Sequence, residues 1–484
     1  MLELENKRYK KLNEIKWDYF AVTQKYNMKG VSKGQIRSYL GALTWIYEKE
    51  DRGNSTHYDA LASALEHYHI VVDRGDFLID FNKVMRIWRD SKEKIIPREH
   101  EKEANLPPPV KEIKEWKKNG LTQLSLFSGA FGLDLGFMAA GFDPKLALDI
   151  DKDASETIKT NLPDIPFIGE DIGKISTKEL LEISETSEGE IDVLVGGPPC
   201  QPFSTAGKRL GLNDPRASPL REFVRVIKEA KPRCFVMEEV EGLQSARLKH
   251  ITITEREIRQ LTPEEEKGSA FKLIVKMLKS TGYNIKFSTL NAADYGAPQF
   301  RKRLIFIGLR EGKPSLPEPT HTNNPQTYLN GKKLSPWTTF WEASADLQNG
   351  EQEYSTFSKK VRQLMELVPP GGNWRNLPED VVQSAMGGAY TSGGGKMGYY
   401  RRLAWDEPSP TVVTSPTQMA TLFCHPEALR PLSVEEYKRL QGFPDDWYLP
   451  ASTSAKYKLI GNAIPVHLSY AIALKVRELL GNEN

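Results

Sequence analysis

The chain has 484 residues, 39% of them hydrophobic and 27% charged, which is ordinary for a globular protein but too long for one compact core. Lysine and arginine (66) nearly balance aspartate and glutamate (64), so binding to nucleic acid would require the positive charge to be gathered on one face. No run of about 18 apolar residues and no apolar N-terminal leader occurs, so we expect neither a membrane span nor a secretory signal.

Residues 1–95 are expected to form a helical accessory domain. Apolar residues in Ser32–Tyr47 recur every three or four positions, as in an amphipathic helix. Residues 1–40 carry nine Lys and Arg against four Asp and Glu, which indicates either an ordinary solvated helix face or a surface that touches DNA. Residues 96–120 are charged and contain Pro107–Pro109, a composition typical of a linker.

Residues 121–310 alternate short apolar runs with helical stretches. This alternation predicts an α/β domain with a mostly parallel sheet, helices on both faces, and ligands at the carboxyl ends of the strands. The expected strands are Leu121–Phe127, Lys145–Ile150, Ile191–Val195, Cys234–Met237, Asn284–Leu290 and Leu304–Leu309.

The alternation ends after residue 310. Residues 311–430 begin with a stretch rich in Pro, Asn and Thr, followed by one rich in Gly, and we expect a smaller domain with irregular loops there. Residues 431–484 are expected to return to the first domain, and Ser469–Leu480 is predicted to form an amphipathic helix that packs on the sheet.

A glycine-rich turn after the first expected strand indicates a nucleotide-like cofactor. Gly129 and Gly132 lie where this strand gives way to a helix, and glycine lets the backbone approach a ligand closely. Asp149 ends the next strand, where a carboxylate is placed to accept ribose hydroxyls. A full Gly-x-Gly-x-x-Gly pattern is missing because Phe131 stands at a position where glycine is expected.

Cys200 has the setting of a nucleophile. It follows two prolines that stiffen a polar loop after an apolar strand, which is a poor place for a core cysteine. Cys234 lies within an apolar strand and is expected in the core. With Cys424 these are the only cysteines, which are too few and too dispersed for a disulfide framework or a structural zinc site, so we expect a reducing compartment and no metal.

Two further charged motifs stand near expected strand ends. Glu238 ends the strand that contains Cys234, and parallel strand ends converge, so its carboxyl group is placed to act near Cys200 as an acid or hydrogen-bonding partner. Arg301 and Arg303 are two positions apart at the start of another strand and should share a face, with donors that suit a carbonyl or phosphate oxygen.

Four motifs in this order resemble the DNA (cytosine-5)-methyltransferase family of prokaryotic restriction–modification systems. They are the glycine turn, Pro199-Cys200-Gln201, Glu238-Glu239-Val240 and Gln299-x-Arg301-x-Arg303. Tyr457–Pro465 resembles the last motif of that family. The resemblance extends from Leu121 to the C-terminus.

The resemblance implies a Rossmann-like, S-adenosylmethionine-dependent methyltransferase sheet, with residues 311–430 as the target-recognition domain and an N-terminal helical extension. It implies Cys200 as nucleophile, Glu238 as partner of cytosine N3, Arg303 as partner of O2, and Arg301 as a residue that orders the site. The implied S-adenosyl-L-methionine site consists of Phe127, Gly129, Asp149, Ile150, Asp171, Ile172, Asn462 and Ala463. The implied DNA contacts, in a loop that closes on DNA, are Gln201, Ser204 and Arg216.

The implied activity is methylation of C5 in a cytosine flipped out of duplex DNA, through a covalent bond between Cys200 and C6. Alternatives are the same chemistry on tRNA, or a non-catalytic DNA-binding regulator with the same fold. We expect a monomer in the prokaryotic cytoplasm, associated with the nucleoid and accompanied by a cognate restriction endonuclease. Three positions depart from the family pattern: Ser125, Phe131, and Glu239 in place of Asn. The carboxylate of Glu239 either favours a protonated Glu238 or is a neutral structural replacement.

Overall fold

The structure, a computed structural model, describes residues 120–199, 218–249, 251, 253–324, 327–391 and 398–481. The expected N-terminal helical domain lies outside the described residues, as do Cys200, Gln201, Ser204 and Arg216. The described chain divides into two compact units. The larger unit contains residues 120–353, 408–414 and 434–481, and the smaller unit contains described residues of 354–407 and 415–433.

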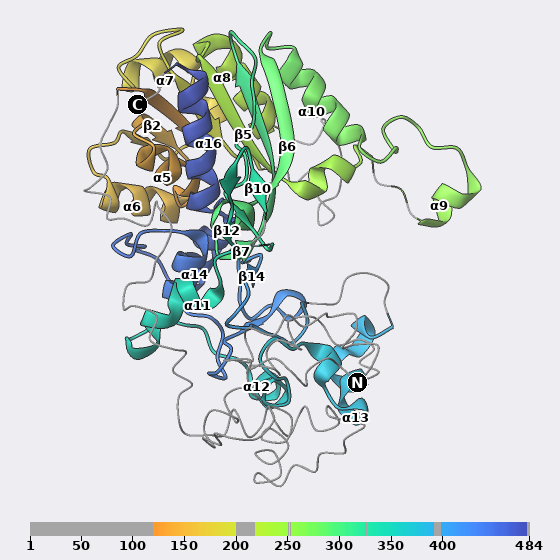
Figure 1. The fold of residues 1–484 in the computed structure, drawn as a ribbon. Helices are drawn as coiled ribbons and strands as arrows, with labels where there is room; N and C mark the ends of the chain where they lie inside the picture. The colour runs from red at the N-terminus through yellow and green to blue at the C-terminus, as the bar shows by residue number, and fades with distance from the viewer. Residues whose placement is uncertain are drawn as a thin grey trace. The chain divides into compact units, whose positions relative to one another are not determined.

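The larger unit is built on a seven-stranded sheet (Figure 1). Five neighbouring strands pair in parallel, and β8 lies antiparallel between β5 and β6. The predicted mostly parallel α/β sheet is therefore confirmed. The strands in spatial order are β3 (Phe167–Ile168), β2 (Asp143–Leu148), β1 (Thr122–Leu126), β4 (Val193–Gly196), β5 (Cys234–Val240), β8 (Lys302–Leu309) and β6 (Asn284–Asn291).

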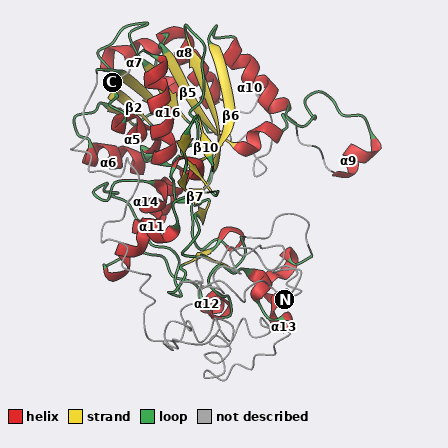
Figure 2. Ribbon diagram, viewed as in Figure 1, coloured by secondary structure: helices red, strands yellow, loops and turns green. Residues whose placement is uncertain are grey.

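Helices cover both faces of this sheet (Figure 2). Alternate side chains of a strand point to opposite faces, so Val193 and Val195 of β4 join one apolar core and Leu194 joins the other. The first core packs against α5 (Gly132–Ala139) and α16 (Val466–Leu479), and the second against α7 (Thr177–Ile183), α8 (Ser218–Ala230) and α10 (Ser269–Lys279). The predicted C-terminal helix is thus present and packs on the sheet.

The connections of the larger unit contain further elements. They are α6 (Lys152–Asn161), η3 (Ile172–Lys174), η7 (Glu241–Ser245), α9 (Ile253–Ile258), η8 (Ala292–Tyr295), β7 (Gln299–Phe300), β9 (His321–Thr322), β10 (Tyr328–Leu329), β11 (Lys332–Lys333), β12 (Ser335–Pro336), α11 (Phe340–Ser344), η9 (Ala345–Asn349), β14 (Ser409–Pro410), α14 (Val434–Gln441) and α15 (Thr453–Asn462). The stretch Thr453–Leu479, which contains both α15 and α16, is long and apolar enough to cross a membrane. However, 67% of its most apolar 18-residue segment is buried within the molecule, as in a core helix.

Residues 311–353 belong to the larger unit, beyond the boundary expected at residue 310. Asp294 of η8 holds this segment, because its backbone oxygen accepts from the Thr320 N–H at 2.9 Å and its Oδ1 accepts from the Trp337 indole at 2.9 Å. The Trp337 ring also packs edge-on against Phe300, with centroids 4.9 Å apart. These contacts join sequence-distant residues, so the change in composition after residue 310 does not mark the boundary.

The smaller unit is irregular, as the sequence predicts for this part of the chain. Its elements are α12 (Lys359–Glu366), η10 (Trp374–Asn376), α13 (Glu379–Met386), η11 (Gly387–Ala389), β13 (Arg401–Arg402), η12 (Met419–Thr421) and β15 (Phe423–Cys424). Backbone carbonyls outside regular structure need other donors when buried. The buried Arg402 guanidinium provides them, donating to the carbonyl oxygens of Val368 (3.1 Å), Pro426 (2.9 Å) and Glu427 (2.7 Å).

Candidate active site

The turn between β1 and α5 presents an open backbone surface at the carboxyl end of the sheet. Phe127 (φ 58°), Gly129 (φ 51°) and Phe131 (φ 73°) all adopt left-handed backbone conformations. A Cβ at Gly129 would meet no atom within 4 Å, so the turn faces open space there. Gly132 has a different role from the expected one. A Cβ there would lie 2.6 Å from the Ile464 backbone oxygen, so this glycine lets the start of α5 pack closely against the chain at Ile464.

Asp149 is fixed beside this turn. Its carboxylate accepts from the Gly129 N–H and from the Asp151 N–H, both at 2.8 Å. Burial raises the pKa of this carboxyl group above its ordinary value, against the lowering effect of the two N–H donors. The neighbouring Ile150 side chain is 66% exposed, so an oriented hydrogen-bond acceptor lies next to an uncovered apolar surface.

The next predicted cofactor residues lie in the turn that follows β3. Asp171 is exposed, and its Oδ1 accepts from the Gly173 N–H at 2.9 Å. The side chain of Ile172 is only 3% exposed and belongs to the apolar core. Ile172 therefore presents almost no surface to a ligand in this structure.

The C-terminal segment adjoins the glycine turn, as expected for a cofactor site that it closes. Ala463 lies against the turn, since a Cβ on Gly132 would be 2.9 Å from its side chain. Asn462 is exposed at the end of α15. The buried Gln441 amide fixes this segment by donating to the carbonyl oxygens of Ile460 (2.6 Å) and Ala463 (2.9 Å).

Arg301 also fixes the segment. Its guanidinium is buried and donates to the carbonyl oxygens of Val412 at 2.7 Å and Gly461 at 2.8 Å. Burial lowers its pKa well below the ordinary value, with the Arg303 charge as a second cause. The two terminal nitrogens of Arg301 thus donate to backbone oxygens, and through these bonds the residue holds the C-terminal segment in place.

Glu238 and Arg303 meet at the end of β5 and the start of β8. Arg303 Nε lies 2.5 Å from Glu238 Oε1, and the two side chains are 12% and 16% exposed. A Cβ at Gly197 would lie 2.9 Å from Glu238 Oε2, so the chain that leads to Cys200 passes directly against this carboxylate. The structure therefore brings together Glu238, Arg303 and the loop before Cys200, while Cys200 itself lies outside the described residues. Glu239 is buried, with 4% exposure.

Several residues that build this site have no local sequence signal. The Gln299 amide donates to the Leu440 carbonyl oxygen (2.6 Å) and to Gln441 Oε1 (2.7 Å), which continues the polar chain to the C-terminal segment. Phe131 stacks on Trp447, with ring centroids 6.2 Å apart and planes 2° from parallel. These contacts join residues far apart in the chain, and only the position of Gln299 within the Gln-x-Arg-x-Arg motif hinted at one of them.

Comparison with known proteins agrees with this geometry. The model of the C-5 cytosine-specific DNA methylase family matches residues 121–478. Type II methyltransferase M.Sau96I of Staphylococcus aureus is 35% identical over 359 residues, which cover 74% of this chain and 76% of that protein. Type II methyltransferase M.Eco47II of Escherichia coli is 37% identical over 367 residues, which cover 76% and 81% respectively.

A solved structure is also similar. It is assigned as a DNA modification methyltransferase encoded within an Escherichia coli prophage, and it aligns with a TM-score of 0.51 and 25% identity over 75% of this chain and 100% of its own. The family match covers the glycine turn, the Cys200 loop, Glu238, both arginines and the C-terminal segment. The chain therefore belongs to the C-5 cytosine-specific DNA methylase family, the enzymes that methylate cytosine in DNA at C5.

Proposed function

We propose that this chain methylates cytosine within a specific duplex sequence, with S-adenosyl-L-methionine as donor and Cys200 as covalent nucleophile. The observation that carries the proposal is the Glu238–Arg303 pair, against which the loop before Cys200 packs at Gly197. A carboxyl group and a guanidinium held together at one strand end match the two polar edges of a cytosine ring.

The residues of the glycine turn fit the proposed cofactor. The space at Gly129 admits a ligand close to the backbone, and the Asp149 carboxylate is oriented to accept ribose hydroxyls. The exposed Ile150 side chain offers an apolar contact for a base. The proposed site is completed by Phe127, Asp171, Ile172, Asn462 and Ala463. When bound there, S-adenosyl-L-methionine supplies an electrophilic methyl group.

The protein residues would activate the cytosine. C5 of cytosine is a weak nucleophile until the Cys200 thiolate adds to C6 and converts the ring to an enamine. Glu238 would hydrogen-bond or protonate N3 and Arg303 would bind O2, so that the charge developing on the ring is stabilised from two sides. After C5 is methylated, loss of its proton and elimination of the thiolate restore the aromatic ring and the free cysteine.

The target base must leave the helix, because stacking hides C6 from a thiol. We propose that Gln201, Ser204 and Arg216 contact the opened DNA and that the smaller unit reads neighbouring base edges. We further propose a monomer that acts in the prokaryotic cytoplasm beside a cognate restriction endonuclease, as in Type II systems. Residues 1–95 would be an accessory domain.

The test is transfer of a labelled methyl group to DNA. The full chain is incubated with labelled S-adenosyl-L-methionine and, in separate reactions, mixed-sequence duplex DNA or tRNA. DNA binding is measured in parallel, and bisulfite sequencing locates the modified cytosines. Label in DNA supports the proposal, provided Cys200→Ser abolishes it and Cys424→Ala, a variant of a buried cysteine in the smaller unit, retains it. Label only in tRNA would establish the RNA alternative, and DNA binding without transfer would establish the non-catalytic regulator.

A further inference from the structure

Helix α8 is firmly anchored on the sheet, and it begins at Ser218, directly after the segment that contains Cys200. Its apolar side chains are buried in the core on the α7 side of the sheet; they are Leu220, Phe223, Val224, Val226, Ile227 and Ala230. Phe223 also packs on the end of β4, since a Cβ at Gly196 would lie 2.9 Å from its ring. This helix is therefore fixed against the strand that leads to Cys200.

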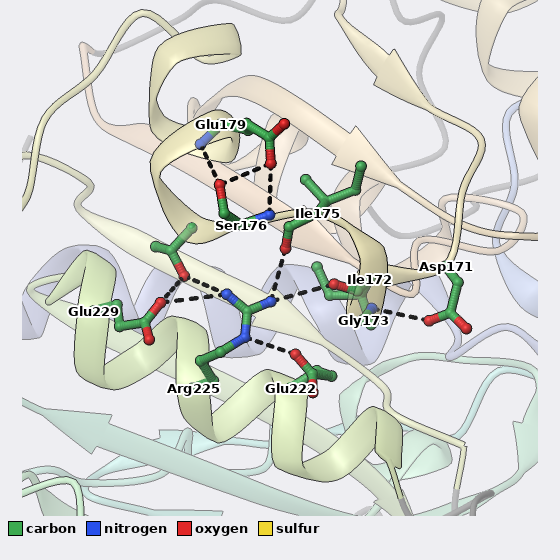
Figure 3. A network of polar contacts seen from close by, with 10 residues as sticks. Asp171, Ile172, Gly173, Ile175, Ser176, Glu179, Glu222, Arg225 and Glu229 are labelled. Carbon is green, nitrogen blue, oxygen red and sulfur yellow. Dashed lines mark hydrogen bonds and ion pairs between the residues drawn. The ribbon is translucent and has the colours of Figure 1, made fainter.

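Arg225 projects from the polar side of α8 toward the turn of Asp171 and Ile172 (Figure 3). Its Nη2 donates to the carbonyl oxygens of Ile172 (3.2 Å) and Ile175 (2.9 Å). Ile172 begins η3 and Ile175 follows it; the Ile172 carbonyl oxygen also accepts from the Ile175 N–H at 3.3 Å. The single nitrogen therefore spans the turn from one end to the other.

The remaining donors of Arg225 are used as well. Nε donates to Glu222 (2.6 Å), and Nη1 donates to the Thr177 hydroxyl (2.7 Å) and to Glu229 (3.3 Å). The Thr177 hydroxyl in turn donates to Glu229 at 2.5 Å. All five N–H groups of a guanidinium thus have acceptors, which leaves its orientation no freedom. The side chain is 26% exposed, so solvent competes with these bonds only in part.

The far side of the turn is fixed by its own contacts. Ser176 caps α7 by accepting from the Glu179 N–H, and Glu179 accepts in return from the Ser176 N–H at 2.8 Å. Asp171 closes the near side through its bond to Gly173. Between these two local motifs, Arg225 ties the turn to α8 through hydrogen bonds, while the Ile172 side chain packs in the core.

We propose that Arg225 is a positioning residue: it clamps the cofactor-binding turn to α8, which packs on the end of β4, and so holds the turn in the conformation that binds the cofactor. This inference rests on the proposed function, because it takes Asp171 and Ile172 as part of the cofactor site. A loosened turn would spend only part of its time in the binding conformation, and apparent affinity falls in proportion to that fraction.

Cofactor affinity measured without turnover tests the proposal. Binding of S-adenosyl-L-homocysteine to the full chain is measured by titration calorimetry for wild type, Arg225→Gln and Arg225→Lys. The control is Arg233→Gln, because Arg233 makes a similar tie at the opposite, amino end of β5, to Asp192 (2.7 Å) and the Leu480 carbonyl oxygen (2.8 Å). Duplex DNA affinity and thermal unfolding are measured in parallel.

We expect Arg225→Gln to weaken S-adenosyl-L-homocysteine binding about tenfold, which corresponds to a turn that adopts its binding conformation about one tenth of the time. Arg225→Lys should recover part of this loss, because an ammonium keeps the charge but not the fork of donors. The DNA affinity of Arg225→Gln should stay within about twofold of wild type. The affinity of Arg233→Gln for S-adenosyl-L-homocysteine should also stay within about twofold of wild type.

Unchanged affinity in folded Arg225→Gln, or equal loss in Arg225→Gln and Arg233→Gln, would overturn the positioning role. If Arg225→Gln does not fold, Arg225→Lys decides by the same criteria. Absence of binding by wild type would instead reject the proposed cofactor site itself.

Discussion

Phe131 stands at a position of the glycine turn where its φ of 73° favours glycine, so Phe131→Gly separates backbone strain from side-chain packing. The strained conformation costs about 1–2 kcal/mol in a residue with a Cβ. The phenyl ring is fully buried and stacked on Trp447, and removing a buried Phe side chain costs about 3–5 kcal/mol. Burial outweighs strain, so we expect the variant to lose about 2–3 kcal/mol of stability.

The measurement is thermal unfolding of the full chain, followed for the transition of the larger unit. At about 2–4 °C for each kcal/mol in a domain of 150–250 residues, the midpoint should fall by about 5–10 °C. Glu185→Gly is the matched control, because Glu185 is exposed and also has a positive φ, of 52°. Its midpoint should stay constant or rise slightly. If Phe131→Gly were as stable as wild type, the packing of Phe131 on Trp447 would not outweigh the backbone strain of the turn.

Other buried and paired groups give further expectations. Arg301→Met leaves two buried carbonyl oxygens without donors and should cost about 2–4 kcal/mol, measured by urea unfolding, and it should also weaken S-adenosyl-L-homocysteine binding. Burial raises the pKa of Asp134 from 3.8 to about 7, so the folded chain keeps a proton that the unfolded chain releases, and this group makes stability fall as pH rises from about 4 to about 7. Asp134→Asn should remove that part of the slope in urea midpoints measured across this range; an unaltered slope would contradict the assignment. Lys458 pairs with Asp151 at 2.7 Å and links α15 to the start of α6. Because the Lys458 side chain is 54% exposed and solvent screens the pair, Lys458→Met should change stability by less than about 1 kcal/mol. The same variant should weaken S-adenosyl-L-homocysteine binding at low salt and make it less sensitive to added salt; calorimetry at two salt concentrations checks this.

The main sheet could be predicted because its strands are short apolar runs that end in turns. Each of the six expected strands overlaps an observed strand, and only the two-residue strand β3 was missed in the sheet. The position of β8 between β5 and β6 could not be predicted, because strand order depends on long-range pairing and not on local pattern. The assignment of residues 311–353 to the larger unit could not be predicted either, because it depends on contacts with Asp294 that amino-acid composition does not indicate.

At the site, sequence order identified which motifs belong together, and the structure shows how they are held. The ion pair between Arg303 and Glu238 joins two of these motifs, and the sequence did not predict this contact. The backbone bonds of Arg301 and the clamp of Arg225 were not predictable, because their acceptors lie many residues away.

The departures at Ser125 and Phe131 also have structural counterparts. The buried carboxyl group of Asp134 hydrogen-bonds Ser125 and accepts from Gln123, so an acidic residue still lies beneath the turn, supplied by α5 instead of β1. Phe131 has the stacked Trp447 ring as its partner.

In the proposed mechanism, Cys200 attacks cytosine in a site formed with Glu238 and Arg303. Duplex DNA containing 5-fluorocytosine tests this attack. With fluorine at C5 the methylated ring has no C5 proton to lose, so the thiolate cannot be eliminated and the bond from sulfur to C6 should persist. With S-adenosyl-L-methionine present, intact mass spectrometry should detect a covalent protein–DNA adduct, and peptide mapping should place it at Cys200. The adduct should form more slowly in Glu238→Gln and be absent in Cys200→Ser. Methylation of normal DNA without any trapped adduct, or an adduct at Cys234 or Cys424, would contradict the account.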